Sequence, residues 1–345
     1  MNADEKYMDR CLQLAKLGAG NVAPNPMVGA LLVCGETIIG EGYHKKYGES
    51  HAEVNCINCV AEANKSLIEK SRMYVSLEPC SHFGKTPPCS NLIIQQKIKK
   101  VVIGCRDIYE KVDGKGIEML RDAGVEVVMG VLEKESKDLN KRFFTFHQKK
   151  RPSIILKWAQ SNNAKIGSEN GERIFISNEY SNRLVHKWRS EEAAILVGKN
   201  TALKDDPELT TRLWKGKNPV RIVIDLNLEL AATSKLFNVE AKTMVYNLLK
   251  NSTKENVEYI QLLREDFLEQ MLLSLYQNNI QSVLVEGGAK TLQSFIDNNL
   301  WDEARVITNR EMVIEKGINA PGMNHFDLTR QEKYFSDTID YFQRK

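Results

Sequence analysis

The chain has 345 residues, of which 42% are hydrophobic and 27% are charged, a balance that is typical of a globular protein and excludes a disordered or collagen-like chain. At about 150 residues per domain, this length predicts two folding units, each large enough to bury a core. The 48 basic and 45 acidic residues give a net charge of +3, which is too small to indicate a nucleic-acid partner. No membrane partner is expected either, because no apolar run approaches the roughly 20 residues of a transmembrane helix.

The seven cysteines are unevenly distributed. All of them lie in the first third of the chain, which indicates a metal site in the N-terminal half. The first residues are charged and polar where a secretory signal would be apolar, so we expect a cytoplasmic protein without disulfides. The cysteines are Cys11, Cys34, Cys56, Cys59, Cys80, Cys89 and Cys105.

Apolar periodicity in residues 1–147 predicts an α/β domain. Strands and helices alternate after an opening hairpin, whose turn is Cys34-Gly35-Glu36. This order is typical of a mixed sheet with helices on both faces. The expected helices are 4–17, 51–63, 91–97, 116–123 and 133–147, and the expected strands are 28–33, 37–39, 73–77, 101–103 and 125–129.

A second α/β domain is expected at 151–345. The boundary falls in the charged stretch Lys149-Lys150-Arg151-Pro152, where the proline stops any continuing helix. The expected strands are 153–156, 193–197, 220–224, 243–246 and 282–285, and the expected helices are 179–188, 266–276 and 289–298.

Three potential metal ligands stand in the N-terminal half: His51, Cys80 and Cys89. An imidazole and two thiolates bind zinc tetrahedrally and leave one position for a water, whose pKa the metal lowers to about 7. Glu53 lies two residues from a ligand and is predicted to carry the proton from this water to a departing amine. Taken singly, such residues are more often packed or solvated side chains, so the prediction depends on their joint occurrence.

The spacing H-x-E followed by P-C-x-x-C is the signature of zinc-dependent nucleobase deaminases. Here the second half is longer, because residues 81–86 separate Cys80 from Pro87-Pro88-Cys89. We expect the inserted residues to form a loop over the pocket. The pair Cys56 and Cys59 is interpreted as helix packing, because it has no partner cysteines nearby in sequence.

Together with residues 24–29 and 40–44, these motifs resemble the bifunctional riboflavin-biosynthesis deaminase/reductase family. The resemblance implies a cytidine-deaminase-like three-layer domain with a mixed sheet. It also implies hydrolytic deamination of 2,5-diamino-6-ribosylamino-4(3H)-pyrimidinone 5′-phosphate, a small phosphoribosyl-pyrimidine. The substrate-binding residues would be Asn25, His44, His82 and Lys85, each of which could equally be ordinary loop polarity.

Residues 156–159, 205–212 and 285–289 resemble the reductase half of the same family, which is similar in fold to dihydrofolate reductase. This implies NADPH-dependent reduction of the ribosyl group to ribityl, giving 5-amino-6-ribitylaminouracil 5′-phosphate. The strand-to-glycine turn at 285–289 can cradle a phosphate or can simply be a tight structural turn. The cofactor positions would be Ala159, Phe175, Thr201, Asp205, Gly288, Ala289, Lys290, Thr291, Leu292, Gln293 and Ser294. The substrate positions would be Arg173, Arg189, Leu209, Arg212 and Glu286, with Arg189 and Arg212 holding the sugar phosphate.

The second half departs from the family pattern at Asn163 and Ala164, where a carboxylate and a glycine are usual, and at Leu226, which replaces a small polar residue. Two alternatives therefore stay open beside the bifunctional enzyme. In the first, the chain is a deaminase whose second half binds but does not reduce. In the second, it is a zinc-stabilised nucleic-acid-binding module. The resemblance also implies a homodimer.

Overall fold

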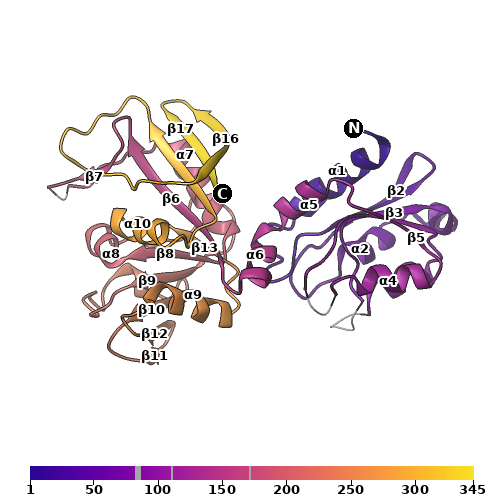
Figure 1. Cartoon of the computed structure of the whole chain (residues 1–345), viewed down its shortest axis with the longest axis horizontal. Coiled ribbons are helices and arrows are strands. Elements are labelled where there is room, and N and C mark those ends of the chain that lie inside the picture. Colours follow the sequence, from indigo (N-terminus) through magenta and orange to yellow (C-terminus); the bar gives the residue numbers. More distant parts are fainter. Residues whose placement is uncertain (82–86, 110–111, 171) are drawn as a thin grey trace. The chain divides into compact units, whose positions relative to one another are not determined.

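The computed structural model describes residues 1–81, 87–109, 112–170 and 172–345. The chain divides into two compact units, Met1–Lys149 and Lys150–Lys345, each with its own sheet and hydrophobic core (Figure 1). None of the helices formed by the described residues combines the length and apolar content needed to cross a lipid bilayer.

The N-terminal unit is built on a five-stranded sheet. Its strands are β1 (Gly29–Cys34), β2 (Thr37–Tyr43), β3 (Arg72–Leu77), β4 (Lys100–Cys105) and β5 (Glu126–Met129). They follow the order β2-β1-β3-β4-β5, with β1 antiparallel to both neighbours and β3, β4 and β5 parallel. The sheet is therefore mixed, as the sequence predicts.

Helices cover both faces of this sheet, because successive strand residues are apolar on both sides. Met8 and Cys11 pack with Leu31 on one face, and Ala52 and Cys56 pack with their neighbours on the other. In Figure 1, α1 and α5 lie on one side of the sheet and α2 and α4 on the opposite side. The helices are α1 (Ala3–Lys16), α2 (Ala52–Asn58), the 3₁₀ helix η1 (Glu62–Lys70), α3 (Cys89–Gln95), α4 (Lys115–Asp122), α5 (Glu133–Leu139) and α6 (Lys141–Lys149).

Two helix predictions in this unit are wrong in extent. The helix expected at 133–147 is two helices, α5 and α6, separated at Asn140. The Asn140 side chain accepts a hydrogen bond from Met27 N and donates one to Met27 O, both at 2.8 Å, so a tertiary contact breaks the helix. The helix expected at 51–63 ends at Asn58, and strand β2 runs on to Tyr43 rather than ending at Ile39.

The C-terminal unit contains a ten-stranded sheet in the order β11-β12-β10-β9-β8-β13-β6-β14-β17-β16. Strands β12, β10, β9, β8, β13, β6 and β14 run parallel, whereas β11, β17 and β16 are antiparallel to their neighbours. The strands are β6 (Ser153–Ser161), β8 (Ala194–Gly198), β9 (Val220–Ile224), β10 (Thr243–Asn247), β11 (Ser252–Lys254), β12 (Val257–Gln261), β13 (Ser282–Val285), β14 (Glu303–Asn309), β16 (Phe326–Tyr334) and β17 (Asp337–Arg344). A separate two-stranded sheet pairs β7 (Lys165–Ser168) with β15 (Gly317–Asn319).

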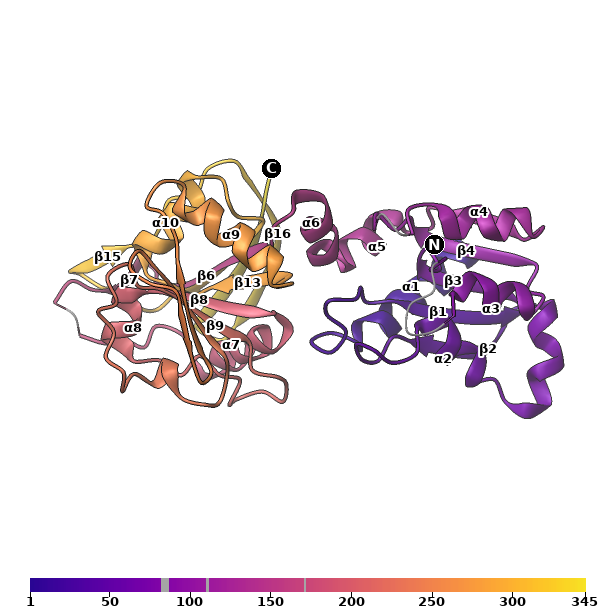
Figure 2. The ribbon, with the colours of Figure 1, turned by 90° about the horizontal axis from the view of Figure 1, so that it is seen from below.

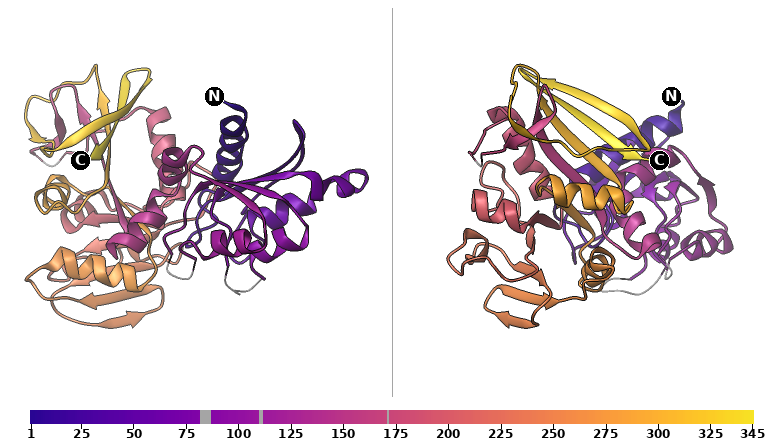
Figure 3. Two further views of the ribbon diagram at one scale, coloured as in Figure 1. Left: turned by 45° about the vertical axis from the view of Figure 1, so that its right-hand side comes forward. Right: turned by 60° about the vertical axis from the view of Figure 1, so that its left-hand side comes forward.

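Helices lie on both faces of the ten-stranded sheet. Figure 2 shows α9 and α10 on one side and α7 and α8 on the other, and Figure 3 shows the long β16–β17 hairpin at the sheet edge. Met271 of α9 and Phe295 of α10 are fully buried in one core cluster, and Trp188 of α7 is buried in another. The helices are α7 (Glu179–Glu191), α8 (Lys199–Asp205), α9 (Phe267–Gln277) and α10 (Ala289–Asp297), with a 3₁₀ turn η2 (Lys235–Phe237).

Candidate active sites

The structure brings His51, Cys80 and Cys89 together in the N-terminal unit. His51 immediately precedes α2, Cys80 follows β3, and Cys89 is the first residue of α3. The Nδ1 atom of His51 lies 3.5 Å from Cys80 Sγ and 3.4 Å from Cys89 Sγ, and all three ligand atoms lie within 4.8 Å of one another. One imidazole and two sulfur ligands from different elements, at these separations, fit a zinc ion with a position left for water.

Electrostatics favour a thiolate in this cluster. A hydrogen bond between the Cys89 and Cys80 side chains lowers the pKa of Cys80 to about 4. The same hydrogen bond raises the pKa of Cys89 well above its usual value. The Cys89 backbone N–H also donates to Cys80 Sγ over 3.3 Å. The hydrogen bond with Cys80 raises the pKa of His51. A sulfur that is already stabilised as a thiolate is ready to bind a dication.

Glu53 lies in the first turn of α2 and is only 3% exposed. Burial raises the pKa of its carboxyl, and the nearby Cys80 raises it further. A raised pKa makes it easier for the carboxyl to hold a proton and then release it, as a general acid/base must.

Asn25 and the buried His44 form a hydrogen-bonded pair near these residues. His44 is 2% exposed, and its ring centroid lies 5.4 Å from that of His51. Its Nδ1 faces the Ser50 carbonyl oxygen at 3.0 Å, and its Nε2 lies 3.2 Å from Asn25 Nδ2. Because a carbonyl only accepts, Nδ1 carries the hydrogen and Nε2 accepts from Asn25. The Asn25 amide oxygen is thereby left to accept a hydrogen bond from a ligand.

The other two predicted substrate residues of this half, His82 and Lys85, lie outside the described residues. So does nearly all of the loop expected at 81–86.

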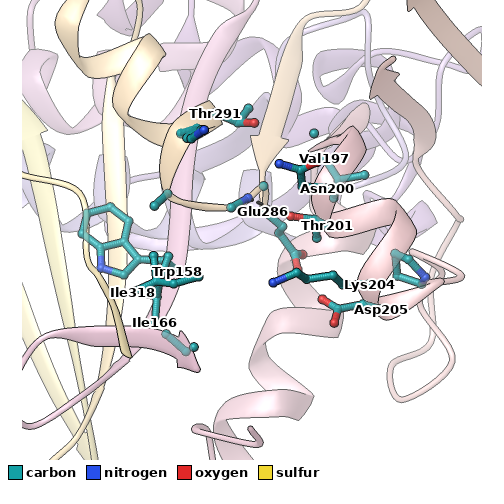
Figure 4. Close-up of a pocket in the computed structure, with 18 of the residues that line it drawn as sticks. Trp158, Ile166, Val197, Asn200, Thr201, Lys204, Asp205, Glu286, Thr291 and Ile318 are labelled. Atoms are coloured by element: carbon teal, nitrogen blue, oxygen red, sulfur yellow. Dashed lines mark hydrogen bonds between the residues drawn. The ribbon is translucent and has the colours of Figure 1, made fainter. Parts of the chain in front are cut away.

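In the C-terminal unit, a cavity of about 680 Å³ opens where β6, β8, β9 and β13 lead into their following segments. In Figure 4, Trp158, Ile166 and Ile318 lie on one side of the cavity, and Asn200, Thr201, Lys204 and Asp205 on the other, with Glu286 between them. Ligands of open α/β sheets bind at the carboxyl ends of the strands, where this cavity lies.

Most of the predicted reductase positions line this cavity. They are Ala159, Arg173, Phe175, Arg189, Thr201, Asp205, Leu209, Glu286, Gly288, Ala289, Lys290 and Thr291. Ser294 lines an adjoining pocket of about 400 Å³. Leu292 is fully buried in the core, and the amide of Gln293 donates to Asp297 over 2.7 Å. Neither of these two residues is among the described residues that line the cavity or the adjoining pocket.

Glu286 forms a buried ion cluster with Arg189 and Lys157. It accepts two hydrogen bonds of 2.8 Å from Arg189, and Lys157 Nζ lies 3.7 Å from Glu286 Oε2. Burial opposes ionisation of Glu286, but the two cations outweigh it and lower the pKa of the carboxyl to about 2. Burial also lowers the pKa of Lys157.

Arg189 and Arg212, the two arginines predicted to hold the sugar phosphate, lie in different environments. The Arg189 guanidinium is occupied by Glu286 and by the Thr210 carbonyl. Arg212 is exposed, and its Nη1 atom lies 3.4 Å from Glu208 Oε2. It is not among the described residues that line the cavity. A bidentate pair with a buried carboxylate leaves Arg189 few donors for a ligand.

Sequence reasoning passed over Lys157, Asn200, Lys204, Ile166 and Ile318, all of which line the cavity. For Lys157 a signal was present, because a lysine inside an apolar buried strand needs a partner. Ile166 and Ile318 come together only through the pairing of β7 with β15, which local patterns do not reveal.

The structure shows where the three residues that depart from the family pattern lie and what they contact. The Asn163 side chain donates to Ile314 O over 2.9 Å and accepts from Ile314 N over 3.2 Å, so it anchors its turn. Ala164 has a φ of 55°, in the left-handed region where glycine is favoured. Leu226 lines the cavity.

Family models match both units of the chain. A family model described as the cytidine and deoxycytidylate deaminase zinc-binding region matches residues 1–105, and one described as the RibD C-terminal domain matches residues 152–309. The fold and the two sites thus define a zinc-dependent deaminase domain joined to a reductase domain.

The riboflavin biosynthesis protein RibD of Aquifex aeolicus is 41% identical over 305 residues, which cover 87% of this chain and 85% of that protein. The Escherichia coli RibD is 32% identical, with 87% and 86% covered. A Thermotoga maritima crystal structure, titled as a diaminohydroxyphosphoribosylaminopyrimidine deaminase/5-amino-6-(5-phosphoribosylamino)uracil reductase, has a TM-score of 0.91 and 36% identity, with 99% of each chain covered. The chain therefore belongs to the RibD family of riboflavin-biosynthesis deaminase/reductases, and the family and fold predicted from the sequence are confirmed.

Proposed function

We propose that residues 1–147 deaminate 2,5-diamino-6-ribosylamino-4(3H)-pyrimidinone 5′-phosphate and that residues 151–345 then reduce its ribosyl group with NADPH. The product is 5-amino-6-ribitylaminouracil 5′-phosphate. The observation that carries this proposal is the convergence of His51, Cys80 and Cys89 beside the buried carboxyl of Glu53.

In the deamination, His51, Cys80 and Cys89 hold zinc. The metal, when bound, lowers the pKa of a water molecule to about 7 and so supplies a nucleophile. Glu53 would accept a proton from the water as the water oxygen bonds to the amino-bearing ring carbon, and would deliver that proton to the amino nitrogen. The C–N bond would then break, so that ammonia leaves and the oxygen stays on the ring carbon. The Asn25 amide oxygen, oriented by His44, accepts a hydrogen bond from the pyrimidine.

In the reduction, the substrate gains a hydride from the nicotinamide and one proton. The cavity beside β13 would hold the nicotinamide and the opened sugar next to each other. The ammonium group of Lys157, which lines this cavity, supplies the proton. The ion pair with Glu286 holds the Lys157 side chain in place. The turn before α10 would bind the cofactor phosphates, because the N–H groups at a helix N-terminus favour anions. Gly287 lets this turn pack closely against the end of β8, since a Cβ there would lie 3.1 Å from Gly198 N.

Three finer statements belong to the same proposal. The cofactor is NADPH rather than NADH, the enzyme is a homodimer, and it works in the cytoplasm. The first two are supported by the family resemblance. The third is also supported by seven free cysteines, which suit a reducing compartment.

The deciding experiment supplies the zinc-loaded protein with the pyrimidine substrate, with and without NADPH, and follows ammonia release and NADPH oxidation together. Ammonia is expected without NADPH, and NADPH oxidation only with the deaminated intermediate. Glu53→Gln should retain zinc but abolish ammonia release, whereas Glu62→Gln, an exposed control in the same unit, should leave it unchanged.

A second candidate function, a deaminase whose C-terminal unit binds without reducing, is favoured by the changes at Asn163 and Ala164. Ammonia release without NADPH oxidation, even with the purified intermediate, would support it. Undiminished ammonia release by Glu53→Gln would refute the acid/base role.

A further inference from the structure

Glu78 is a buried carboxylate that the chemistry above does not use. It follows β3 directly, two residues before Cys80, and is 4% exposed. Its Oε2 accepts the backbone N–H groups of Asp107 (3.2 Å) and Gly114 (3.1 Å), and its Oε1 accepts those of Gly116 (3.0 Å) and Ile117 (3.4 Å). A single carboxylate thus holds four backbone donors, three of them at the start of α4.

The glycine at the start of α4 lets the two segments approach closely. A side chain at Gly116 would place its Cβ 2.0 Å from the Pro79 carbonyl oxygen and 3.2 Å from Glu78 Oε1. Helix α4 therefore packs directly against the peptide that leads to Cys80. No larger residue fits at Gly116 without moving that peptide.

The same peptide is held from its other end by α3. The Ser90 backbone N–H donates to Cys80 O over 3.1 Å, and the Ser90 hydroxyl lies 3.0 Å from the same oxygen. Ser90 is fully buried and directly follows the ligand Cys89. The hydrogen bonds of Glu78 to α4 and those of Ser90 to Cys80 O thus hold residues 78–80 from two sides. All of them join protein atoms to protein atoms.

We infer that Glu78, together with Ser90, is a positioning residue for the zinc site, holding Cys80 at its ligand position whether or not the metal is present. This inference rests on the zinc site of the proposed function. A ligand whose backbone is already fixed loses little conformational freedom when zinc binds, so the metal is held more tightly. Loss of outer partners of this kind typically weakens metal affinity by about 10- to 100-fold.

The test measures zinc affinity by competition with a chromogenic chelator on the full-length chain. In Glu78→Gln the amide nitrogen donates rather than accepts, so about two of the four backbone bonds are lost. We expect zinc affinity to fall by about 10- to 100-fold. Glu118→Gln is the matched control, because Glu118 is an exposed glutamate on α4, the helix whose first backbone N–H groups Glu78 accepts.

Circular dichroism establishes that each variant is folded. A folded Glu78→Gln variant with wild-type zinc affinity would overturn the inference. If Glu78→Gln does not fold, Ser90→Ala decides: a loss of about tenfold in zinc affinity supports the two-anchor arrangement, and an unchanged affinity overturns it. A wild-type chain that binds no zinc would instead refute the proposed function.

Discussion

The buried Glu286 carboxylate offers a quantitative test of the C-terminal site. Replacing Glu286 with Gln removes the charge that faces Arg189 and Lys157, whose side chains are only 12% and 14% exposed. The two cations are then left buried without their counter-ion. The expected result is a loss of stability in the C-terminal unit and of its reductase activity.

The magnitude follows from the pKa of Glu286, which is lowered from 4.5 to about 2. Each pKa unit corresponds to about 1.4 kcal/mol, so the ionised carboxylate contributes about 3 kcal/mol to the free energy of unfolding. Breaking a buried ion pair by removing one partner typically costs about 3–5 kcal/mol, which agrees with this figure.

The lowered pKa of Glu286 also fixes the direction in which the free energy of unfolding changes with pH. A carboxyl whose folded pKa lies below its unfolded pKa stabilises the protein fully above about pH 4.5. That contribution is lost as the pH falls from about 4.5 to about 2. The wild type and Glu286→Gln should therefore differ by about 3 kcal/mol at pH 7 and converge near pH 2.

Urea unfolding followed by tryptophan fluorescence isolates this unit, because Trp158, Trp188, Trp214 and Trp301 are all four of the tryptophans in the chain and lie in the C-terminal unit. Glu315→Gln, at an exposed position of the same unit, is the control. A Glu286→Gln variant destabilised by less than about 1 kcal/mol at pH 7 would show that the cluster is not the coupled ion pair inferred here.

Three further predictions concern both units. Gly42→Ala should destabilise the N-terminal unit by at least about 1–3 kcal/mol by circular dichroism, because its Cβ would lie 2.2 Å from Cys56 N in α2, and the tryptophan transition should not move. Removing zinc with a chelator should stop ammonia release but leave NADPH oxidation with the deaminated intermediate unchanged. Burial lowers the pKa of His186 to about 4, so the C-terminal unit should lose up to about 3 kcal/mol as the pH falls from 6.5 to 4, and His186→Asn should lose less by urea titration.

The grouping of His51, Cys80 and Cys89 could be predicted from the sequence because the motifs that indicate it are local. His51 and Glu53 are two residues apart at the start of one helix, and each cysteine follows a proline at the end or start of an element. Such short motifs fix ligand type and orientation before the fold is known. The positioning role of Glu78 was not predictable, because its four donors lie 29 to 39 residues away in sequence.

Long-range pairing explains most of what the sequence did not predict. Strands β7 and β15 are separated by about three quarters of the C-terminal unit, and both are very short. Strand β16 is largely exposed and polar, so it lacks the apolar pattern of a buried strand. The break between α5 and α6 depends on Met27, more than 100 residues earlier in the chain. Periodicity reports which residues can be buried, but not which distant segment will bind them.

The altered turn at Asn163 and Ala164 is also held by a long-range contact that local patterns do not reveal. The substitution of alanine at a φ of 55° costs about 1–2 kcal/mol, a small amount that many other contacts can offset. Asn163 offsets part of it directly through its two hydrogen bonds to Ile314. Neither residue is among the described residues that line the cavity, whereas the charged cluster of Lys157, Arg189 and Glu286 does line it and is complete. The altered turn therefore changes how this segment is held rather than the charged groups that line the cavity, which favours a reducing over a merely binding C-terminal unit.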